Sequence, residues 1–517
     1  GILLLLPALL INLDRLNIFM AVDEATRGLV ALEMMISGNY VTPTINGDFY
    51  YNKPPLFNWI LIVFYQLFGI NELAQRLPTV VSLIGFGFTV YYFVKKELGT
   101  QAGIVTAFVF VTSGRIIYWE SLLGYIDTTF AWVAYCGMMF VITFIREKKF
   151  LQLFLVSYTF MTIGFFLKGL PAIVFQGITL LVVFTSEKEF RRLFTWQHLA
   201  GGLIFILGMG TYYLIYNQYN SLENIFYHLW NESAQRTVIE QGTTVTFKHL
   251  VLFPFEMIYH YLPWSLLIVF TFSRGFWPAV FENKFLKLNL IVFGFNIIPY
   301  WTSPAVYPKY IMMLVPMILT LLVFFYLRKK NAKARMVTWM ETVFLLAAAL
   351  LTLGYLAIPF LPQFHVTSNV VLKSILLFIL SAMLVYLFWK LKTQRLVIFA
   401  IILIVARIAL DWFIWPQRAP EVAHFEKDAL EVARITEDEK VYYYNAHTLQ
   451  YGASYVITRE KWDIVRNQNS DPKMGIFYIT DNDGLKKIKE NYENVKTYYT
   501  YPNAEDGRQF NLIKILD

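Results

Sequence analysis

Long apolar segments alternate with short polar ones over the first 414 residues of the chain. A helix needs about 20 apolar residues to cross the hydrocarbon core of a bilayer, or fewer where protein protects its ends. By this rule the pattern predicts about 13 membrane-spanning helices. They cover residues 1–12, 78–94, 101–118, 125–145, 151–167, 169–185, 199–217, 258–273, 285–301, 309–327, 339–360, 369–389 and 396–414.

Basic residues fall in alternate loops between these segments, around residues 95–96, 146–149, 188–192, 274–287, 328–335 and 390–395. Loops rich in Lys and Arg stay in the cytoplasm, so a single orientation satisfies all six loops. This orientation places a first loop (13–77), a second loop (218–257) and everything after residue 415 on the external side.

The first external loop carries its own helical pattern. Apolar residues at helical spacing predict an amphipathic helix over 24–37 that lies along the membrane. An extended segment follows over 40–49, with its turn at Asn46-Gly47-Asp48. Pro54-Pro55 then begin a second helix at 56–68. The second external loop contains a similar interfacial helix near 223–235.

After about residue 418 charges become frequent and the apolar runs shorten to strand length. We predict helices at 421–434, 446–452 and 483–491, and strands at 441–444, 475–480, 495–500 and 509–515. This alternation indicates a small α/β domain. The predicted fold is thus an α-helical polytopic membrane domain over 1–415 and an extracytoplasmic α/β domain over 416–517.

The composition agrees with a membrane protein. Hydrophobic residues make up 57% of the 517 residues and charged residues only 15%, whereas about a quarter of a soluble domain is charged. The net charge of +8 reflects the basic loops between spans, which argues against nucleic acid as a partner. The single cysteine, Cys136, excludes an intramolecular disulfide. We interpret the short opening GILLLLPALLI as the tail of a trimmed span, with no cleavable signal peptide.

Carboxylates at two places are candidates for chemistry. Asp23 and Glu24 are adjacent at the start of the predicted helix 24–37. A carboxylate close to a membrane is costly unless it is solvated, paired or used. Both are therefore candidate catalytic residues, although Asp23 also suits a helix cap. Asp127, at the external mouth of the span 125–145, is a third catalytic candidate or the N-cap of that span.

Cations gather on the same external side. The proline that follows Lys53 holds it extended, so this lysine is either a phosphate ligand or a residue that snorkels toward the headgroups. Lys168 lies in a two-residue turn, Lys309-Tyr310 lie at the external end of another span, and Arg236 lies in the second loop. Together with the carboxylates, these cations suit an anionic lipid phosphate as leaving group and a hydroxyl that needs a base.

Three histidines, His228, His249 and His260, are external or nearly so, but their spacings match no metal-ligand motif. No metal ligand and no cofactor is therefore assigned, and a divalent metal is left open.

The motifs resemble those of a known family. The first loop contains Asp-Glu, Glu-Met, Ser-Gly-Asn-Tyr-Val-Thr-Pro, Asn-Gly and Asn-Lys-Pro-Pro. The later motifs are Arg76-Leu77-Pro78, Tyr125-Ile126-Asp127, Lys168-Gly169, Gln235-Arg236, Leu262-Pro263-Trp264 and Lys309-Tyr310. Over residues 14–320 this series resembles the C-type superfamily of polytopic glycosyltransferases. Within it, the protein O-mannosyltransferase and lipid A aminoarabinose transferase family is the most similar branch.

The resemblance implies transfer of a sugar from a polyprenyl-phosphate-linked donor, with inversion at the anomeric carbon, in the bacterial inner membrane. The acceptor would be a lipid A-like lipid, a glycan or a protein hydroxyl. Asp23 would act as base or position the acceptor, Lys53 would bind the lipid phosphate, and Asp127 would support the site. Further residues would line the phosphate cavity, namely Lys168, Arg236, Lys309 and Tyr310.

Two places depart from the family pattern. Thr26 replaces the arginine of Asp-Glu-x-Arg, and Arg27 stands one position later, which turns its side chain by about 100° on a helix. Asn52 and, nearby, Ser233 stand where the aminoarabinose branch favours a glutamate and a histidine. These replacements argue against a metal site like that branch's and against aminoarabinose as the sugar.

A polytopic transporter or flippase of lipid-linked sugars is the alternative. Transporters place ionisable residues near the bilayer midplane and often contain repeated halves. Here the charged groups cluster at one external face and no repeat is visible, which favours an enzyme. A third interpretation makes the C-terminal domain a binder of envelope glycans and the membrane part its anchor, which leaves the dense polar first loop unexplained.

Overall fold

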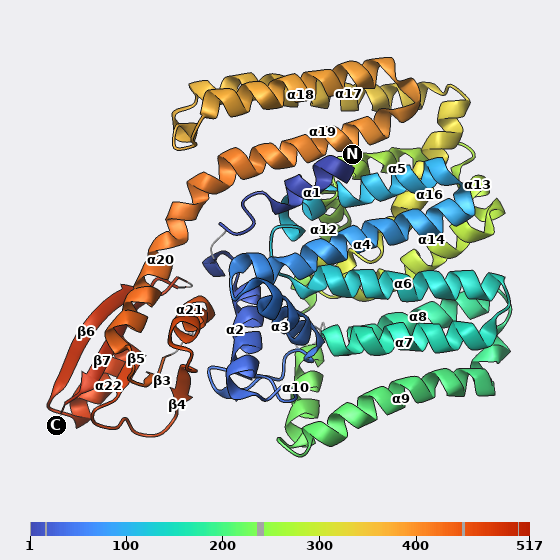
Figure 1. Cartoon of the computed structure of the whole chain (residues 1–517). Helices are drawn as coiled ribbons and strands as arrows, with labels where there is room; N and C mark the ends of the chain where they lie inside the picture. Colours follow the sequence, from blue (N-terminus) through green and yellow to red (C-terminus); the bar gives the residue numbers. More distant parts are fainter. Residues whose placement is uncertain (1, 16–17, 235–241, 447–449, 505, 517) are drawn as a thin grey trace. The chain divides into compact units, whose positions relative to one another are not determined.

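A computed structural model describes residues 2–15, 18–234, 242–446, 450–504 and 506–516. The chain forms two compact units, whose elements carry the labels of Figure 1. The helical unit contains residues 1–11, 52–54 and 79–414. The mixed unit contains residues 12–51, 55–78 and 415–517, so it is assembled from both ends of the sequence.

The helical unit is built from helices that follow the predicted apolar segments. Its α-helices are α1 (Ile2–Leu10), most of α4 (Glu72–Leu98), α5 (Thr100–Val111), α6 (Ile126–Arg146), α7 (Phe150–Lys168), α8 (Pro171–Ser186), α9 (Trp196–Tyr216), α10 (Leu222–Ala234), α12 (Thr243–His260), α13 (Phe276–Glu282), α14 (Lys284–Asn296), α15 (Ile298–Thr302), α16 (Val315–Asn331), α17 (Arg335–Ala357), α18 (Val370–Lys390) and α19 (Arg395–Ala409). Shorter 3₁₀ and π turns include η2 (Ile116–Glu120), η4 (Trp264–Phe272) and η5 (Pro308–Ile311).

The described residues contain eight helical segments long and apolar enough to cross a membrane, or nine if η4 and α13, bent by 97°, count as one span. All 13 predicted segments fall on helical elements, but some of these are short. The helix α1 has 9 residues, α5 has 12 and α8 has 16. Because a window of apolar residues does not register where a helix breaks, the pattern predicted more crossings than there are full-length helices.

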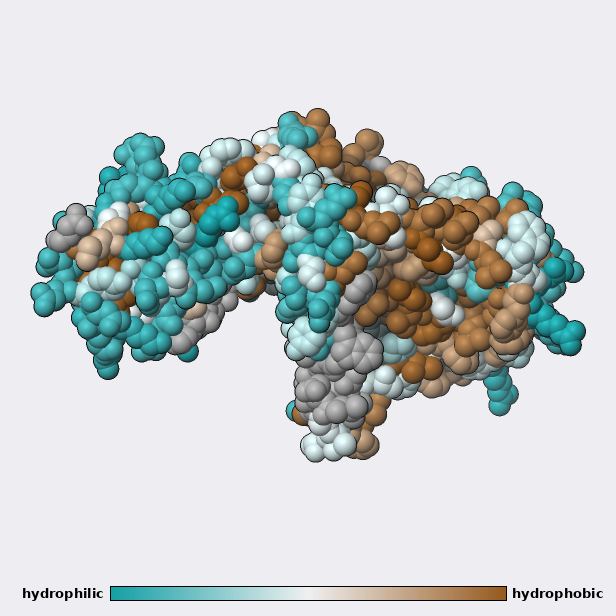
Figure 2. Space-filling model, turned by 90° about the horizontal axis from the view of Figure 1, so that it is seen from below, coloured by the Kyte–Doolittle hydropathy of each residue, from teal (hydrophilic) through white to brown (hydrophobic). Residues whose placement is uncertain are grey.

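Lipid-facing and central helices differ in burial. The apolar window of α6 is 72% buried, whereas those of α17 and α18 are only 22% buried. Figure 1 shows α17 and α18 as an adjacent pair, and the two helices pack on each other. Hydrophobic residues cover much of the helical unit's surface in Figure 2. An apolar surface of this extent is stable against lipid tails and not against water.

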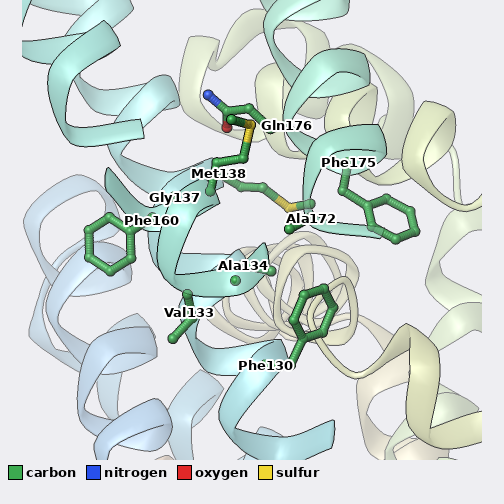
Figure 3. A pocket seen from close by; sticks show the side chains of 11 residues that line it. Phe130, Val133, Ala134, Gly137, Met138, Phe160, Ala172, Phe175 and Gln176 are labelled. Carbon is green, nitrogen blue, oxygen red and sulfur yellow. The ribbon is translucent and has the colours of Figure 1, made fainter. Parts of the chain in front are cut away.

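Small residues allow α6, α7 and α8 to pack closely. A Cβ at Gly137 of α6 would lie 3.2 Å from Cβ of Phe160, and one at Gly164 of α7 would lie 3.2 Å from Cβ of Ala172. A cavity of about 20 Å³ remains between the three helices, beside Met138 and Gln176 (Figure 3). This volume is close to that of one water molecule, so the cavity is a packing defect and not a substrate site.

The mixed unit combines the first loop with the C-terminal domain. From the loop come α2 (Val22–Ser37), β1 (Thr44–Ile45), β2 (Asp48–Phe49), α3 (Leu56–Phe68) and the start of α4. From the C-terminal domain come α20 (Trp415–Thr436), β3 (Val441–Tyr444), α21 (Tyr451–Lys461), β4 (Arg466–Gln468), β5 (Phe477–Asp481), α22 (Asn482–Asn491), β6 (Val495–Pro502) and β7 (Gln509–Ile515).

The strands of the C-terminal domain form one five-stranded sheet in the order β4-β3-β5-β7-β6. β3 pairs in parallel with β4 and β5, and β7 pairs antiparallel with β5 and β6. One face of the sheet packs on α22 through a core of buried residues, Tyr478, Ile488, Ile513 and Ile515. The predicted fold class, an α-helical polytopic membrane protein with a small C-terminal α/β domain, is confirmed.

Two C-terminal elements differ from the prediction. The helix expected at 446–452 is found later, as α21, and residues 447–449 lie outside the described part of the chain. β4 was not predicted, because its sequence Arg-Asn-Gln has no apolar residue and so no hydrophobic alternation.

Candidate active site

Asp127 holds two lysines together in the helical unit. It is the second residue of α6, 5% exposed, and Tyr125 occupies the N-cap position. Its Oδ1 pairs with Nζ of Lys168, the last residue of α7, and its Oδ2 lies 3.4 Å from Nζ of Lys309 in η5. The carboxylate is therefore occupied by lysines from two other elements, which excludes the simple capping role.

Aromatic rings surround this cluster, which we define as Asp127, Lys168 and Lys309. The ammonium of Lys168 lies 3.9 Å from the ring centroid of Tyr310, and that of Lys309 lies 3.9 Å from the ring of Tyr125. Ring faces attract cations, most strongly where water is excluded. Two buried lysines share one carboxylate, so the formal charges of these three residues sum to +1. A buried surplus charge is costly unless a ligand neutralises it, which makes the cluster suited to an anion.

A pocket of about 260 Å³ adjoins the cluster within the helical unit. Lys53, Lys168 and Tyr310 contribute to its wall. The other lining residues are Asn52, Leu170, Pro171, Val174, Phe175, Pro299, Tyr300, Ser303, Ala305 and Val306. Charged and polar groups thus share the pocket with an apolar surface, as an amphipathic ligand with an anionic head requires.

A second buried acid, Glu120, lies seven residues before Asp127 and was not predicted. It is 1% exposed, and its Oε1 accepts a hydrogen bond of 2.6 Å from Nε of Arg115. Burial raises the pKa of Glu120 to about 7, although Arg115 opposes the shift. Arg115 stands inside the predicted span 101–118, and a charge in an apolar segment is a functional signal that sequence analysis can use.

The segment that carries Arg115 is tied to the turn that carries Lys309. The amide of Gly114 donates to the carbonyl of Leu262 at 2.8 Å, and the hydroxyl of Tyr261 donates to the carbonyl of Pro308 at 2.8 Å. A Cβ at Gly114 would lie 2.5 Å from that Leu262 oxygen, so only glycine permits this approach. These contacts give the Asp127–Lys168–Lys309 cluster a rigid support.

The two predicted carboxylates of the first loop differ in their surroundings. Asp23 is exposed in the first turn of α2, and the N-cap position of this helix is occupied by Ala21. The carboxylate of Asp23 therefore interacts favourably with the helix dipole but is not the N-cap. Glu24 is fully buried, and its two oxygens accept hydrogen bonds of 2.6 and 2.9 Å from Arg76. Glu24 therefore anchors α2 to α4, and its predicted catalytic role stays a prediction.

Comparison with known proteins agrees with these features. Residues 52–213 match the model of the dolichyl-phosphate-mannose-protein mannosyltransferase family. An uncharacterized protein from Aquifex aeolicus is 24% identical over 328 residues, which are 61% of this chain and 61% of that protein. An undecaprenyl phosphate-alpha-4-amino-4-deoxy-L-arabinose arabinosyl transferase from Proteus mirabilis is 25% identical over 226 residues, which are 43% of this chain and 40% of that enzyme. The chain thus matches less than two thirds of the length of these relatives.

The fold extends the similarity over the whole chain. The crystal structure of ArnT from Cupriavidus metallidurans bound to undecaprenyl phosphate is similar with a TM-score of 0.70 and 17% sequence identity, over 99% of this chain and 97% of that one. The chain is thus similar to protein mannosyltransferases in one segment, to aminoarabinose transferases in another, and to ArnT in fold. The resemblance predicted from the motifs is confirmed.

Arg27, which departs from the pattern of this family, has a defined place. It is 6% exposed, its guanidinium donates to the hydroxyl of Tyr50, and it lies 5.0 Å from the centroid of that ring. Tyr50 precedes Lys53 by three residues. Arg27 therefore holds the residue that follows β2.

One predicted phosphate ligand cannot be located in the structure. Arg236, predicted to bind the donor phosphate, lies outside the described residues, as does Gln235. Among the residues that are described, no group of three or more His, Cys, Asp or Glu is placed to hold a metal ion.

Proposed function

We propose that this chain is an inverting glycosyltransferase that moves one sugar from a polyprenyl-phosphate donor to a hydroxyl acceptor at the extracytoplasmic membrane face. The observation that supports it best is the Asp127–Lys168–Lys309 cluster, with its excess positive charge, beside the amphipathic pocket lined by Lys53. Such a pocket suits a lipid with a phosphate head. The matched names share this chemistry, since one family is named for dolichyl-phosphate-mannose and the other for an undecaprenyl phosphate-linked arabinose.

The mechanism assigns the two chemical tasks to different residues. When the bond between the anomeric carbon and the phosphate oxygen breaks, the phosphate gains negative charge. Lys53, Lys168 and Lys309 stabilise that charge, with Tyr310 holding Lys168 in place. Asp23 accepts the proton of the acceptor hydroxyl as the hydroxyl attacks the opposite face of the sugar, which inverts the configuration. From the family resemblance, Arg236 joins the phosphate ligands.

The sugar is a pentose or a hexose, and the acceptor is a lipid, a glycan or a protein hydroxyl. The basic residues of six alternate loops support a location of the site and the C-terminal domain outside the cytoplasm. A bacterial inner membrane is the setting that the undecaprenyl lipid of the relatives favours.

Mass spectrometry of lipids and proteins from cells with and without the chain tests the proposal. We expect one acceptor to lose a mass equal to one pentose or hexose residue when the chain is absent, and to regain it with the wild-type chain. A lipid-linked sugar that changes sides of the membrane, with no acceptor modified, would instead identify a flippase.

A further inference from the structure

The hairpin of the first loop is unusually buried for a turn. β1 and β2 pair antiparallel, and the two residues between them, Asn46 and Gly47, have φ angles of 49° and 77°. Asn-Gly is the sequence that such a two-residue hairpin prefers. Turn residues are normally exposed, yet Asn46 has 0% exposure.

Asn46 is buried because the C-terminal domain closes over it. Its side-chain amide donates to Oγ of Ser454 at 2.9 Å and to the carbonyl of Val465 at 3.0 Å. Its own carbonyl accepts from the amide of Asn467 at 2.9 Å. The side chain of Asn467 also donates to Oδ2 of Asp48, at 2.6 Å. Four hydrogen bonds thus join one tight turn to residues more than 400 positions later.

The same turn is bonded to the helix that carries Asp23. Glu33 of α2 is fully buried, and its carboxylate accepts from the amides of Asn46 at 2.6 Å and Gly47 at 3.2 Å, and from the hydroxyl of Thr44 at 2.7 Å. At the other end of α2, Glu24 is bound by Arg76. The helix is therefore fixed at both ends. One of these anchors passes through Asn46 to the C-terminal domain, and α2 also packs directly on α21 of that domain.

We propose that the C-terminal domain serves sugar transfer by holding α2 and Asp23 in place, and that Asn46 is a positioning residue through which it does so. We call the group Glu33, Asn46, Ser454, Val465 and Asn467 the Asn46 clasp. The inference rests on the proposed function, in which Asp23 takes the acceptor proton. A misplacement of a catalytic group by about 1 Å costs up to about 100-fold in rate, so a looser clasp reaches the chemistry without touching substrate.

Asn46→Gly is the variant that isolates the clasp. Glycine adopts the positive φ and keeps the backbone bonds to Glu33 and Asn467, but it lacks both side-chain donors. Asn467→Ala removes the bond to Asp48 from the other side. Thr500→Val is the matched control, because it removes one side-chain hydrogen bond of 3.0 Å, to Asn511, in the same sheet but outside the clasp.

Purified full-length protein in lipid nanodiscs is measured in three ways: sugar transfer, binding of undecaprenyl phosphate and amide hydrogen exchange of α2. In Asn46→Gly and Asn467→Ala we expect kcat to fall about 10- to 100-fold, binding of undecaprenyl phosphate to stay unchanged, and exchange over residues 22–37 to accelerate. The double variant should lose little more than each single one, since the hydrogen bonds removed all attach the same hairpin to the C-terminal domain. Thr500→Val should match the wild type in all three.

Wild-type kcat in Asn46→Gly, or exchange of α2 no faster than in Thr500→Val, would overturn the inference. Loss of undecaprenyl phosphate binding in the clasp variants would also overturn it, because general unfolding would then explain the lower rate. A wild-type chain that transfers no sugar would instead overturn the proposed function, and the exchange of α2 would still decide whether the C-terminal domain holds that helix.

Discussion

The helical unit and the mixed unit each bury an ion-paired carboxylate, and the two sites are built differently. In the mixed unit one arginine, Arg76, binds both oxygens of one glutamate, Glu24, so the charges cancel. In the helical unit Asp127 is shared by Lys168 and Lys309, so the formal charges of these three side chains sum to +1 beside a pocket. A balanced buried pair marks a scaffold, whereas an unbalanced one beside a cavity marks a place for a ligand of opposite charge.

The largest expected effect is on the rate of sugar transfer, when the exposed carboxylate of the mixed unit is replaced. Asp23→Asn should lower the rate of sugar transfer by about 10²- to 10⁴-fold, because the acceptor hydroxyl loses its base. Thermal stability and binding of undecaprenyl phosphate should not change, since Asp23 is solvent-exposed. Asp14→Asn, at another exposed position of the same loop, serves as control. Full activity of Asp23→Asn with a polyprenyl-phosphate sugar would contradict the assignment.

The next largest effect is on the free energy of unfolding, and it compares variants of the two buried carboxylates. Asp127→Asn and Glu24→Gln should each lower the free energy of unfolding by about 3–5 kcal/mol, because each leaves a buried cation without its counter-charge. Undecaprenyl phosphate should raise the melting temperature of Asp127→Asn more than that of the wild type, since its phosphate replaces the missing anion. It should shift Glu24→Gln and the wild type equally. Equal shifts in all three proteins would remove the distinction between scaffold and ligand site.

A smaller effect is expected at the lysine that lines the pocket without joining the cluster. Lys53→Ala should weaken binding of undecaprenyl phosphate by about 10- to 100-fold, the value of one charge-assisted hydrogen bond. At saturating donor the rate should change less. Lys96→Ala is the control, because that lysine pairs with Glu147 at 2.9 Å on the predicted cytoplasmic side. Unchanged affinity in Lys53→Ala would exclude its role as a phosphate ligand.

The smallest expected effect is on how the free energy of unfolding varies with pH, through a buried carboxyl of the mixed unit. Burial raises the pKa of Glu33 from 4.5 to about 7, despite the hydrogen bonds that favour the charged form. Between these values the folded protein binds a proton that the unfolded chain has released, so stability should fall as the pH rises from about 4.5 to about 7. Denaturant unfolding at several pH values measures this slope.

Glu33→Gln should flatten that slope, whereas Glu490→Gln, at an exposed position of α22, should keep it. If both variants keep the wild-type slope, Glu33 is not the titrating group.

The sequence predicted the elements better than their contacts. Helix α3 and strand β3 begin and end at the predicted residues, since prolines or charged residues border clear apolar patterns there. Charge alternation assigns each span end to one side of the membrane, so it predicted which cations share a side. That grouping brought Asp127, Lys168 and Lys309 into one set before any contact was known.

The contacts between distant residues could not be predicted from the sequence. Glu24 and Arg76 are 52 residues apart, and no local pattern shows that one neutralises the other. The bond of Asn46 to Ser454 joins residues 408 positions apart, although Asn-Gly alone gave the turn. Tertiary packing also hid Glu120, whose burial raises the pKa of its carboxyl to about 7.

The assembly of the mixed unit from both ends of the chain has a consequence for biosynthesis. A ribosome that adds about 5–20 residues per second needs on the order of 20–80 s to pass from Asn46 to Ser454. During that time the hairpin and Glu33 exist without the partners that bury them. A translation product that stops before the C-terminal domain therefore has the pocket and its lysines, but it lacks the C-terminal contacts that hold the helix of Asp23. We expect activity only after the whole chain has been synthesised.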